Sequence, residues 1–434
     1  MTHPPIDPNT AKAHAAELEL TVDRTLARGR AHSSRFVRLV VVAPSGDPTK
    51  QRPPVRIGFV IDRSGSMSGT PMECARQAVL AGMRLLGPDD EAAVVAFDTV
   101  VETPVPLTLV REGLPMAERT VPGISARGGT NLADGWLSAC AQVGAPSVRT
   151  MNRRVILLTD GQANEGITDP RELARHANEL RVRGLSTATL GLGEGFDERL
   201  LSDMAEAGGG PARFAATPQD IAKAIMECVG DAIETTVSAA EVTLRVPGAE
   251  FELLSAGVPA ARIGELRVSL GDLAANQERE VVVRVRLPLG NDGEVVPLHA
   301  TFTGTGQAGD LIMASAQSGW TFADHERNDQ QARDRSVDRV VANLYAAAAR
   351  QRAVQHNREH NFGAAQRELE AVARRIQGYA TGDLELEALV SELQHEALDF
   401  GRDLGEMARK RSHYRSTSAL AASAPDGSSR RRER

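Results

Sequence analysis

Two apolar, β-branched segments of this sequence, residues 55–61 and 155–158, each lead into an aspartate or a Thr-Asp pair. Parallel strands that end together bring their following loops to one sheet edge, where α/β proteins bind ligands. The oxygen-bearing side chains expected there are Asp62, Ser64, Ser66, Thr130 and Asp160. Carboxylate and hydroxyl oxygens, without thiol or imidazole, suit hard divalent ions such as Mg2+. The sequence therefore predicts a metal site at this edge.

In order and spacing these residues resemble the metal-ion-dependent adhesion site (MIDAS) of von Willebrand factor A (VWA) domains, written D-x-S-x-S, then Thr, then Asp. The resemblance covers roughly residues 53 to 234. It implies that all five residues bind a divalent cation, Mg2+ in the first instance, with Mn2+ or Ca2+ as alternatives. It also implies that an Asp or Glu of a partner protein fills the open coordination position. The implied function is a non-enzymatic, metal-dependent protein-protein interaction scaffold.

Within residues 53–234, apolar strand-like runs alternate with amphipathic helical patterns. This alternation is typical of an α/β fold with a doubly wound, mainly parallel, Rossmann-like sheet. Strands are predicted near residues 55–62, 92–97, 155–159 and 185–190, with an antiparallel edge strand near 100–107. Helices are predicted near residues 72–86, 132–142, 170–180 and 221–233.

Short β segments follow in residues 237–323, separated by Gly- and Asn-containing turns, which indicates a β-sandwich-like domain. Two more strands are predicted in the N-terminal residues 17–48. Because the later sheets need partners for their edges, we expect the N-terminal strands to pair with them. The α/β domain would then be an insertion. As a whole the chain resembles multi-domain bacterial VWA proteins with a VWA domain of the inter-alpha-trypsin-inhibitor-like or calcium-activated-channel-like type.

Residues 324–411 carry helical periodicity and predict a helical hairpin or bundle. Its last helix has a heptad-like seam made of Leu386, Val390, Leu393, Ala397, Phe400, Leu404 and Met407. This spacing fits packing within a bundle, which we favour, and self-association through a coiled coil. Residues 1–16 and the Arg- and Ser-rich tail, residues 412–434, lack an apolar face and are predicted to be disordered.

Composition narrows the class of protein. The formal net charge of −7 gives no general attraction to nucleic acid or anionic membranes. The three cysteines are widely spaced, which favours free thiols in a reducing compartment. Without an N-terminal apolar segment or an 18-residue apolar run, we expect a cytoplasmic protein with no membrane span.

Two alternative functions remain open from the sequence. His356, Glu359 and His360 match the H-x-x-E-H pattern of inverted zinc metallopeptidases, which would make the chain a zinc-dependent hydrolase. No lysine follows a glycine, so the chain lacks a Walker A motif. A role as accessory subunit of an AAA+ ATPase would therefore require a separate motor protein.

Overall fold

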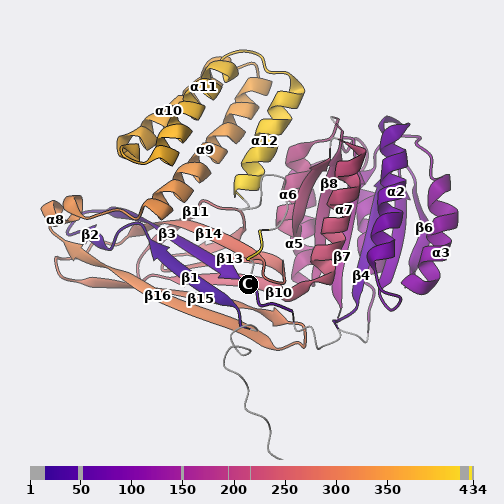
Figure 1. Cartoon of the computed structure of the whole chain (residues 1–434), viewed down its shortest axis with the longest axis horizontal. Coiled ribbons are helices and arrows are strands. Elements are labelled where there is room, and N and C mark those ends of the chain that lie inside the picture. The colour runs from indigo at the N-terminus through magenta and orange to yellow at the C-terminus, as the bar shows by residue number, and fades with distance from the viewer. Residues whose placement is uncertain are drawn as a thin grey trace, which may run out of the picture.

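The computed structural model describes residues 15–46, 52–147, 151–193, 195–215, 217–420 and 430–432. An α/β domain lies beside a β-sandwich, and a helical bundle stands over the sandwich and reaches the α/β domain (Figure 1). The three modules therefore meet in the middle of the molecule.

The sheet of the α/β domain has the strand order β6-β5-β4-β7-β8-β9, in which β6 runs antiparallel to β5 and the other pairs are parallel. Its strands are β4 (Val55–Asp62), β5 (Glu91–Phe97), β6 (Val101–Leu109), β7 (Asn152–Thr159), β8 (Leu185–Leu192) and β9 (Gly209–Ala215). All residues of β4 are buried, because β4 is a central strand with helices on both faces. The predicted α/β fold class is confirmed.

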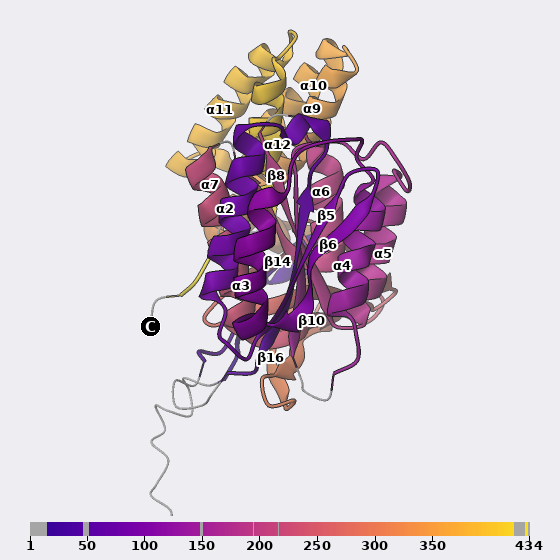
Figure 2. The same cartoon turned by 90° about the vertical axis from the view of Figure 1, so that its right-hand side faces the viewer.

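Helices α2 (Thr70–Leu85), α3 (Val110–Thr120) and α7 (Pro218–Ile233) cover one face of this sheet. The other face is covered by α4 (Leu132–Val143), α5 (Pro170–Val182) and α6 (Glu198–Gly208) (Figure 2). Two 3-10 turns, η1 (Gly65–Met67) and η2 (Val121–Gly123), lie in its loops. α3, α6 and β9 were not predicted. α3 contains Pro115 and β9 begins with Gly-Gly-Pro, residues that disfavour regular structure.

Two sheets pack face to face as a β-sandwich, one with the order β1-β3-β14-β11 and the other β12-β13-β10-β15-β16-β2. N-terminal strands β1 (Glu17–Val22), β2 (Leu26–Arg28) and β3 (Ser33–Val42) join strands that follow the α/β domain. The later strands are β10 (Thr235–Arg245), β11 (Glu250–Leu253), β12 (Val258–Arg262), β13 (Glu265–Ala274), β14 (Glu278–Leu287), β15 (Val295–Gly306) and β16 (Leu311–Ala323). Since β3 pairs with β14 over its whole length, the α/β domain is inserted into the sandwich.

The C-terminal module contains α8 (His325–Gln330), α9 (Arg335–Arg358), α10 (Phe362–Ala380), α11 (Leu384–Phe400) and α12 (Glu406–Leu420). α9, α10 and α11 share one hydrophobic core. The predicted heptad seam is not one continuous helix, because α11 ends at Phe400 and Gly401 caps it. Its buried members, Leu386 to Phe400, pack inside the bundle.

The predicted disordered tail is wrong at two places. Residues 412–420 belong to α12. Arg431 and Arg432 also pair with acids of other modules, at 2.9 Å from Asp231 and 2.8 Å from Glu278 respectively. Acidic partners distant in sequence hold these arginines, and residue patterns do not reveal such partners. Residues 421–429 and 433–434, and residues 1–14 of the predicted disordered N-terminus, lie outside the described residues.

Two predictions from composition concern thiols and membranes. Cys74, Cys140 and Cys228 are free and buried, as predicted. Across the described ranges, no helix combines the length and apolar character that crossing a bilayer requires.

Candidate metal centre

The predicted metal-binding residues lie together at the carboxyl ends of two adjacent central strands. Asp62 is the last residue of β4, and Asp160 follows the last residue of β7, its neighbour in the sheet. Thr130 lies in the loop that leads into α4. We call the set Asp62, Ser64, Ser66, Thr130 and Asp160 the oxygen cluster.

Hydrogen bonds between side chains, and the atoms that surround Gly161, show that the oxygens of the cluster lie close together. Ser66 Oγ donates to Asp160 Oδ1 at 2.7 Å, and the hydroxyls of Ser64 and Ser66 are 3.1 Å apart. A β-carbon built at Gly161 would lie 3.5 Å from Thr130 Oγ1, 3.6 Å from Asp62 Oδ2 and 3.7 Å from Ser66 Oγ. Oxygens from three loops therefore surround one small space, which the absence of a side chain at Gly161 leaves open.

Residues outside the predicted set hold the cluster in place. Thr159 Oγ1 donates to Asp62 Oδ2 at 2.5 Å, and the backbone N–H of Ser64 donates to Asp62 Oδ1 at 2.8 Å. The side-chain oxygen of Asn164 accepts from the backbone N–H of Thr130 at 2.8 Å. Thr159 and Asn164 were not predicted as positioning residues. Thr159 could have been found, because it directly precedes a predicted ligand.

Burial leaves the two carboxylates of the cluster in need of positive charge. Asp62 is 0% exposed and Asp160 is 7% exposed, and burial raises the pKa of both carboxyl groups. Among the described residues, no ion pair with a basic side chain reaches either acid. A divalent cation would supply the missing charge, and an all-oxygen donor set suits Mg2+. The residues present thus fit the ion that the motif implies.

Ion pairs fix the loops around the oxygen cluster. The Arg63 guanidinium lies 3.1 Å from Asp98, and Arg127 lies 2.9 Å from the same carboxylate. Both arginines also bond to Glu102 on β6, at 2.7 Å from Arg63, and this holds the pKa of Glu102 at about 2. These contacts tie the loops after β4 and before α4 to β5 and β6. They hold in place the two loops that carry Ser64, Ser66 and Thr130.

The alternative zinc motif is not assembled on one helical face. α9 ends at Arg358, and His360 lies beyond it with a left-handed backbone φ of 57°. His356 Nδ1 is 3.8 Å from a carboxylate oxygen of Glu359, a distance that gives only a loose contact. In the described part of the chain, no group of three or more His, Cys, Asp or Glu side chains is placed to hold a metal. The oxygen cluster differs in kind, since it combines two carboxylates with three hydroxyls.

Comparison with known proteins agrees with the fold. Residues 57–227 match the family model of the von Willebrand factor type A domain. This region is a VWA domain. Over 199 residues the chain is 30% identical to human inter-alpha-trypsin inhibitor heavy chain H4, a match that covers 44% of this chain and 21% of H4. It is 27% identical over 283 residues to an uncharacterized protein of Synechocystis, covering 62% of this chain and 65% of that protein.

Two solved structures are similar to the whole chain, not only to the VWA domain. A von Willebrand factor type A protein from Catenulispora acidiphila gives a TM-score of 0.70 at 18% identity, covering 97% of this chain and 99% of that one. The ArnB paralog VWA2 from Sulfolobus acidocaldarius gives 0.62 at 15% identity, covering 95% and 99%. At these identities the likeness shows the fold. The chain spans less than two thirds of the length of both sequence relatives.

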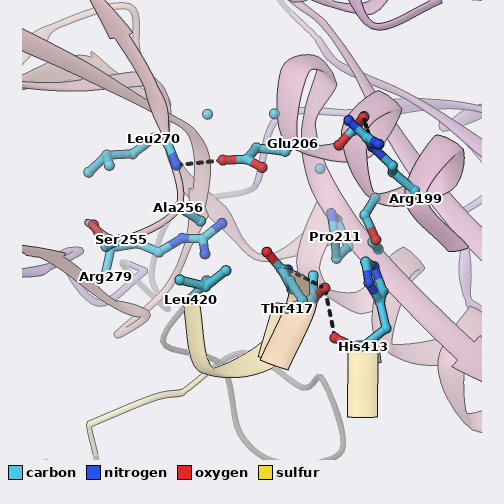
Figure 3. A pocket seen from close by; sticks show the side chains of 18 of the residues that line it. Arg199, Glu206, Pro211, Ser255, Ala256, Leu270, Arg279, His413, Thr417 and Leu420 are labelled. Carbon is cyan, nitrogen blue, oxygen red and sulfur yellow. Dashed lines mark hydrogen bonds and ion pairs between the residues drawn. The ribbon is translucent and has the colours of Figure 1, made fainter. Parts of the chain in front are cut away.

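A cavity of about 770 Å3 lies where the VWA domain meets the other two modules (Figure 3). On its VWA side, Glu206 of α6 accepts a hydrogen bond of 2.9 Å from the backbone N–H of Gly257 in the sandwich. On its helical side, Thr417 Oγ1 donates to the carbonyl oxygen of His413 at 3.1 Å. His413 Nε2 is buried and has no hydrogen-bond partner among the described residues. All three modules therefore line the cavity, and they contribute polar groups to its wall.

Proposed function

We propose that the VWA domain binds a divalent cation, Mg2+ in the first instance, through the oxygen cluster, and that the bound cation captures a carboxylate of a partner protein. The observation that carries the proposal is the convergence of Thr130, Asp62 and Ser66 oxygens on the space beside Gly161. The buried acids without basic partners support it.

Each residue of the oxygen cluster would have a defined part. Asp62 and Asp160 would balance the charge of the cation, while the hydroxyls of Ser64, Ser66 and Thr130 would add neutral oxygens. A cation held this way keeps attraction for one further anionic ligand. Asp62 and Ser64 are buried whereas Ser66 is exposed, so a partner would approach from the side of Ser66. We infer that the chain is a binding protein of the cytoplasm and not an enzyme.

Metal titration of purified variants tests the first half of the proposal. We expect wild type to bind Mg2+ and Mn2+ in calorimetry and Asp62→Ala to show no binding. Asp89→Ala is the matched control, because it removes the same charge from an exposed side chain whose ion pair with Arg111, at 3.1 Å, lies on the surface. Equal binding by wild type and Asp62→Ala would contradict the proposed metal site.

Capture of partner proteins tests the second half. Proteins retained by wild type in Mg2+ should be lost with EDTA and lost with Asp62→Ala, but retained by Asp89→Ala. Partners that persist in both the EDTA and the Asp62→Ala experiments would place the binding surface outside the oxygen cluster. The metal would then have a structural role.

A further inference from the structure

The turn between β8 and α6 packs directly behind one of the proposed metal ligands. A β-carbon built at Gly195 would lie only 2.7 Å from the main-chain carbonyl oxygen of Asp160. That distance is shorter than real side chains allow, so the two backbone segments are in tight contact. Because the packing is tight, a shift of this turn would also displace the backbone that carries Asp160.

The next residue of the turn, Phe196, touches the β8 residue that pairs with Thr159, the support of the other acid. The ring of Phe196 lies against Gly191 of β8, where a β-carbon would come within 2.5 Å of the ring. Gly191 pairs with Thr159 between β8 and β7, and the Thr159 hydroxyl donates to Asp62. Phe196 is itself buried. One turn thus contacts the backbone of Asp160 directly, and it reaches Asp62 through Gly191 and its strand partner Thr159.

A lysine of the helical module holds this turn. Lys410 of α12 is 5% exposed, and its Nζ donates to the carbonyl oxygen of Phe196 at 2.6 Å. The same ammonium group lies 4.2 Å from the centroid of the Phe196 ring. α12 lies beside α6 in Figure 1, although the two residues are 214 positions apart in sequence.

Charged side chains also connect the helical module to the start of α6. Glu198, which is 5% exposed, pairs with Arg358 of α9 and lies 4.0 Å from Lys410. Arg358 also lies 2.7 Å from Glu406 of α12. The side chains of two helices in the C-terminal module therefore converge on the four residues that follow Gly195. We call Phe196, Glu198, Arg358 and Lys410 the clamp.

We propose that the clamp makes the helical module part of the metal site, with Lys410 and Glu198 as positioning residues for Asp160 and Asp62. Docking of α12 and binding of the cation would then stabilise each other. This inference rests on the proposed metal-binding function and adds a means of regulating it. A partner that pulls α12 away from α6 would weaken metal binding, and with it the capture of a carboxylate.

Because thermodynamic coupling is reciprocal, it can be measured on the affinity for the cation and on the stability of the clamp. If the clamp raises the affinity for the cation, the cation must stabilise the clamp by the same free energy. Coupled sites in proteins typically change each other's affinity by roughly 5- to 150-fold. Since the clamp acts through backbone contacts and not by coordination, we expect a change of about fivefold, at the low end of that range.

The test compares Lys410→Met with Lys223→Met in the full chain. Methionine keeps a long apolar side chain and removes the ammonium group. Lys223 on α7 is the matched control, because its side chain is 57% exposed and its contact with Glu227 is 3.8 Å long. The measurements are Mn2+ affinity by calorimetry and hydrogen exchange of the amides in residues 195–201 without metal. Lys410→Met should bind Mn2+ about fivefold more weakly and exchange faster in this segment, and Lys223→Met should do neither.

Wild type supplies a measurement that requires no variant. Saturating Mn2+ should slow hydrogen exchange in α12 around Lys410, and should have no such effect in Asp62→Ala. Unchanged exchange in α12, or faster exchange of residues 195–201 in Lys410→Met with unchanged Mn2+ affinity, would overturn the coupling while leaving the metal site intact. If wild type binds no Mn2+ at all, the proposed function itself fails. Glu198→Gln repeats the comparison if Lys410→Met does not fold.

Discussion

Two acidic sites of the VWA domain are buried to a similar degree but differ in how their charge is balanced. Asp62 and Asp160 in the oxygen cluster have no basic partner among the described residues. Glu198 in the clamp, 5% exposed, has both Arg358 and Lys410. A buried carboxylate that the chain pairs with its own cations joins modules together. One that the chain leaves unpaired retains affinity for an ion from solution.

The largest effect that separates the two sites is on stability without metal. Glu198→Ala would remove the acid that Arg358 and Lys410 share, while Arg358 would keep its pair with Glu406. Breaking a buried pair typically costs about 3–5 kcal/mol, and because Glu406 remains we expect a loss of about 3 kcal/mol. Asp62→Asn removes a buried charge that has no basic partner and keeps an acceptor for the Ser64 amide. In EDTA we expect it to change the free energy of unfolding by less than about 1 kcal/mol. Urea unfolding of both variants measures the difference.

A single surface charge provides the control for that experiment. Glu118→Ala removes a carboxylate whose pair with Arg84, both half exposed, contributes little. Should Glu198→Ala and Glu118→Ala unfold at the same urea concentration, the clamp would not stabilise the chain. Should Asp62→Asn lower the stability as much as Glu198→Ala, the oxygen cluster would have structural support that its contacts do not reveal.

The two sites also differ in how far the sequence predicts them. The oxygen cluster depends on short segments at strand ends, where Ser64 and Ser66 follow Asp62 in the same loop, at the η1 turn. Strand pairing then brings Asp160 beside them. Residue order and the α/β pattern were sufficient for these positions and for the fold class. The supporting Thr159 was missed because a threonine in a buried strand also fits the β propensity of such strands.

The clamp could not be predicted, because its helix buries a polar face. Among the α12 residues whose burial is described, Lys410, His413 and Ser416 are buried, and they are spaced three residues apart. A surface helix is recognised in a sequence by an apolar stripe at this spacing, so residues 412–420 were wrongly predicted to be disordered. Lys410 contacts Phe196 and Glu198 of the VWA domain, far away in sequence, whereas Ser416 Oγ donates to the carbonyl oxygen of Ser412 within α12. Only the tertiary structure shows that the Lys410 ammonium group finds its hydrogen-bond acceptor in the VWA domain.

A second prediction concerns the space within the oxygen cluster. Gly161→Ala places a methyl group at 3.5–3.7 Å from three cluster oxygens, which is ordinary contact in the absence of metal. The fold should therefore be retained. The methyl group would occupy room that a cation needs, so we expect the affinity for Mn2+ to fall by at least about tenfold, as for groups adjacent to metal ligands.

Calorimetry with Mn2+ measures the effect, and Gly123→Ala is the control. A β-carbon at Gly123 would meet no atom within 4 Å, and the residue lies in the η2 turn. Undiminished Mn2+ binding by Gly161→Ala would mean that the cation does not sit in the space surrounded by these oxygens. The clamp should be unaffected in either case, which separates this substitution from those at Lys410.

The smallest expected effect is a pH dependence that arises beside the clamp. Burial lowers the pKa of His413, with Glu198 and Asp197 acting in the opposite direction and Arg358 and Arg199 in the same direction. The unfolded chain, where histidine has a pKa near 6.5, therefore binds more protons than the folded chain. The free energy of unfolding should fall as pH decreases below about 6.5, by at most about 1.4 kcal/mol per pH unit from this one group.

Urea unfolding between pH 7.5 and 5.5 measures this slope in wild type, in His413→Gln and in the exposed control His395→Gln. We expect His413→Gln alone to flatten the slope, because glutamine cannot take up a proton in the unfolded chain. The oxygen cluster contains no histidine. The contribution of His413 to the pH dependence of the unfolding free energy should therefore persist in Asp62→Asn. An equal slope in wild type and His413→Gln would contradict this prediction. It would mean that His413 takes up a proton as readily in the folded chain as in the unfolded chain, and that water reaches the contact between α12 and α6.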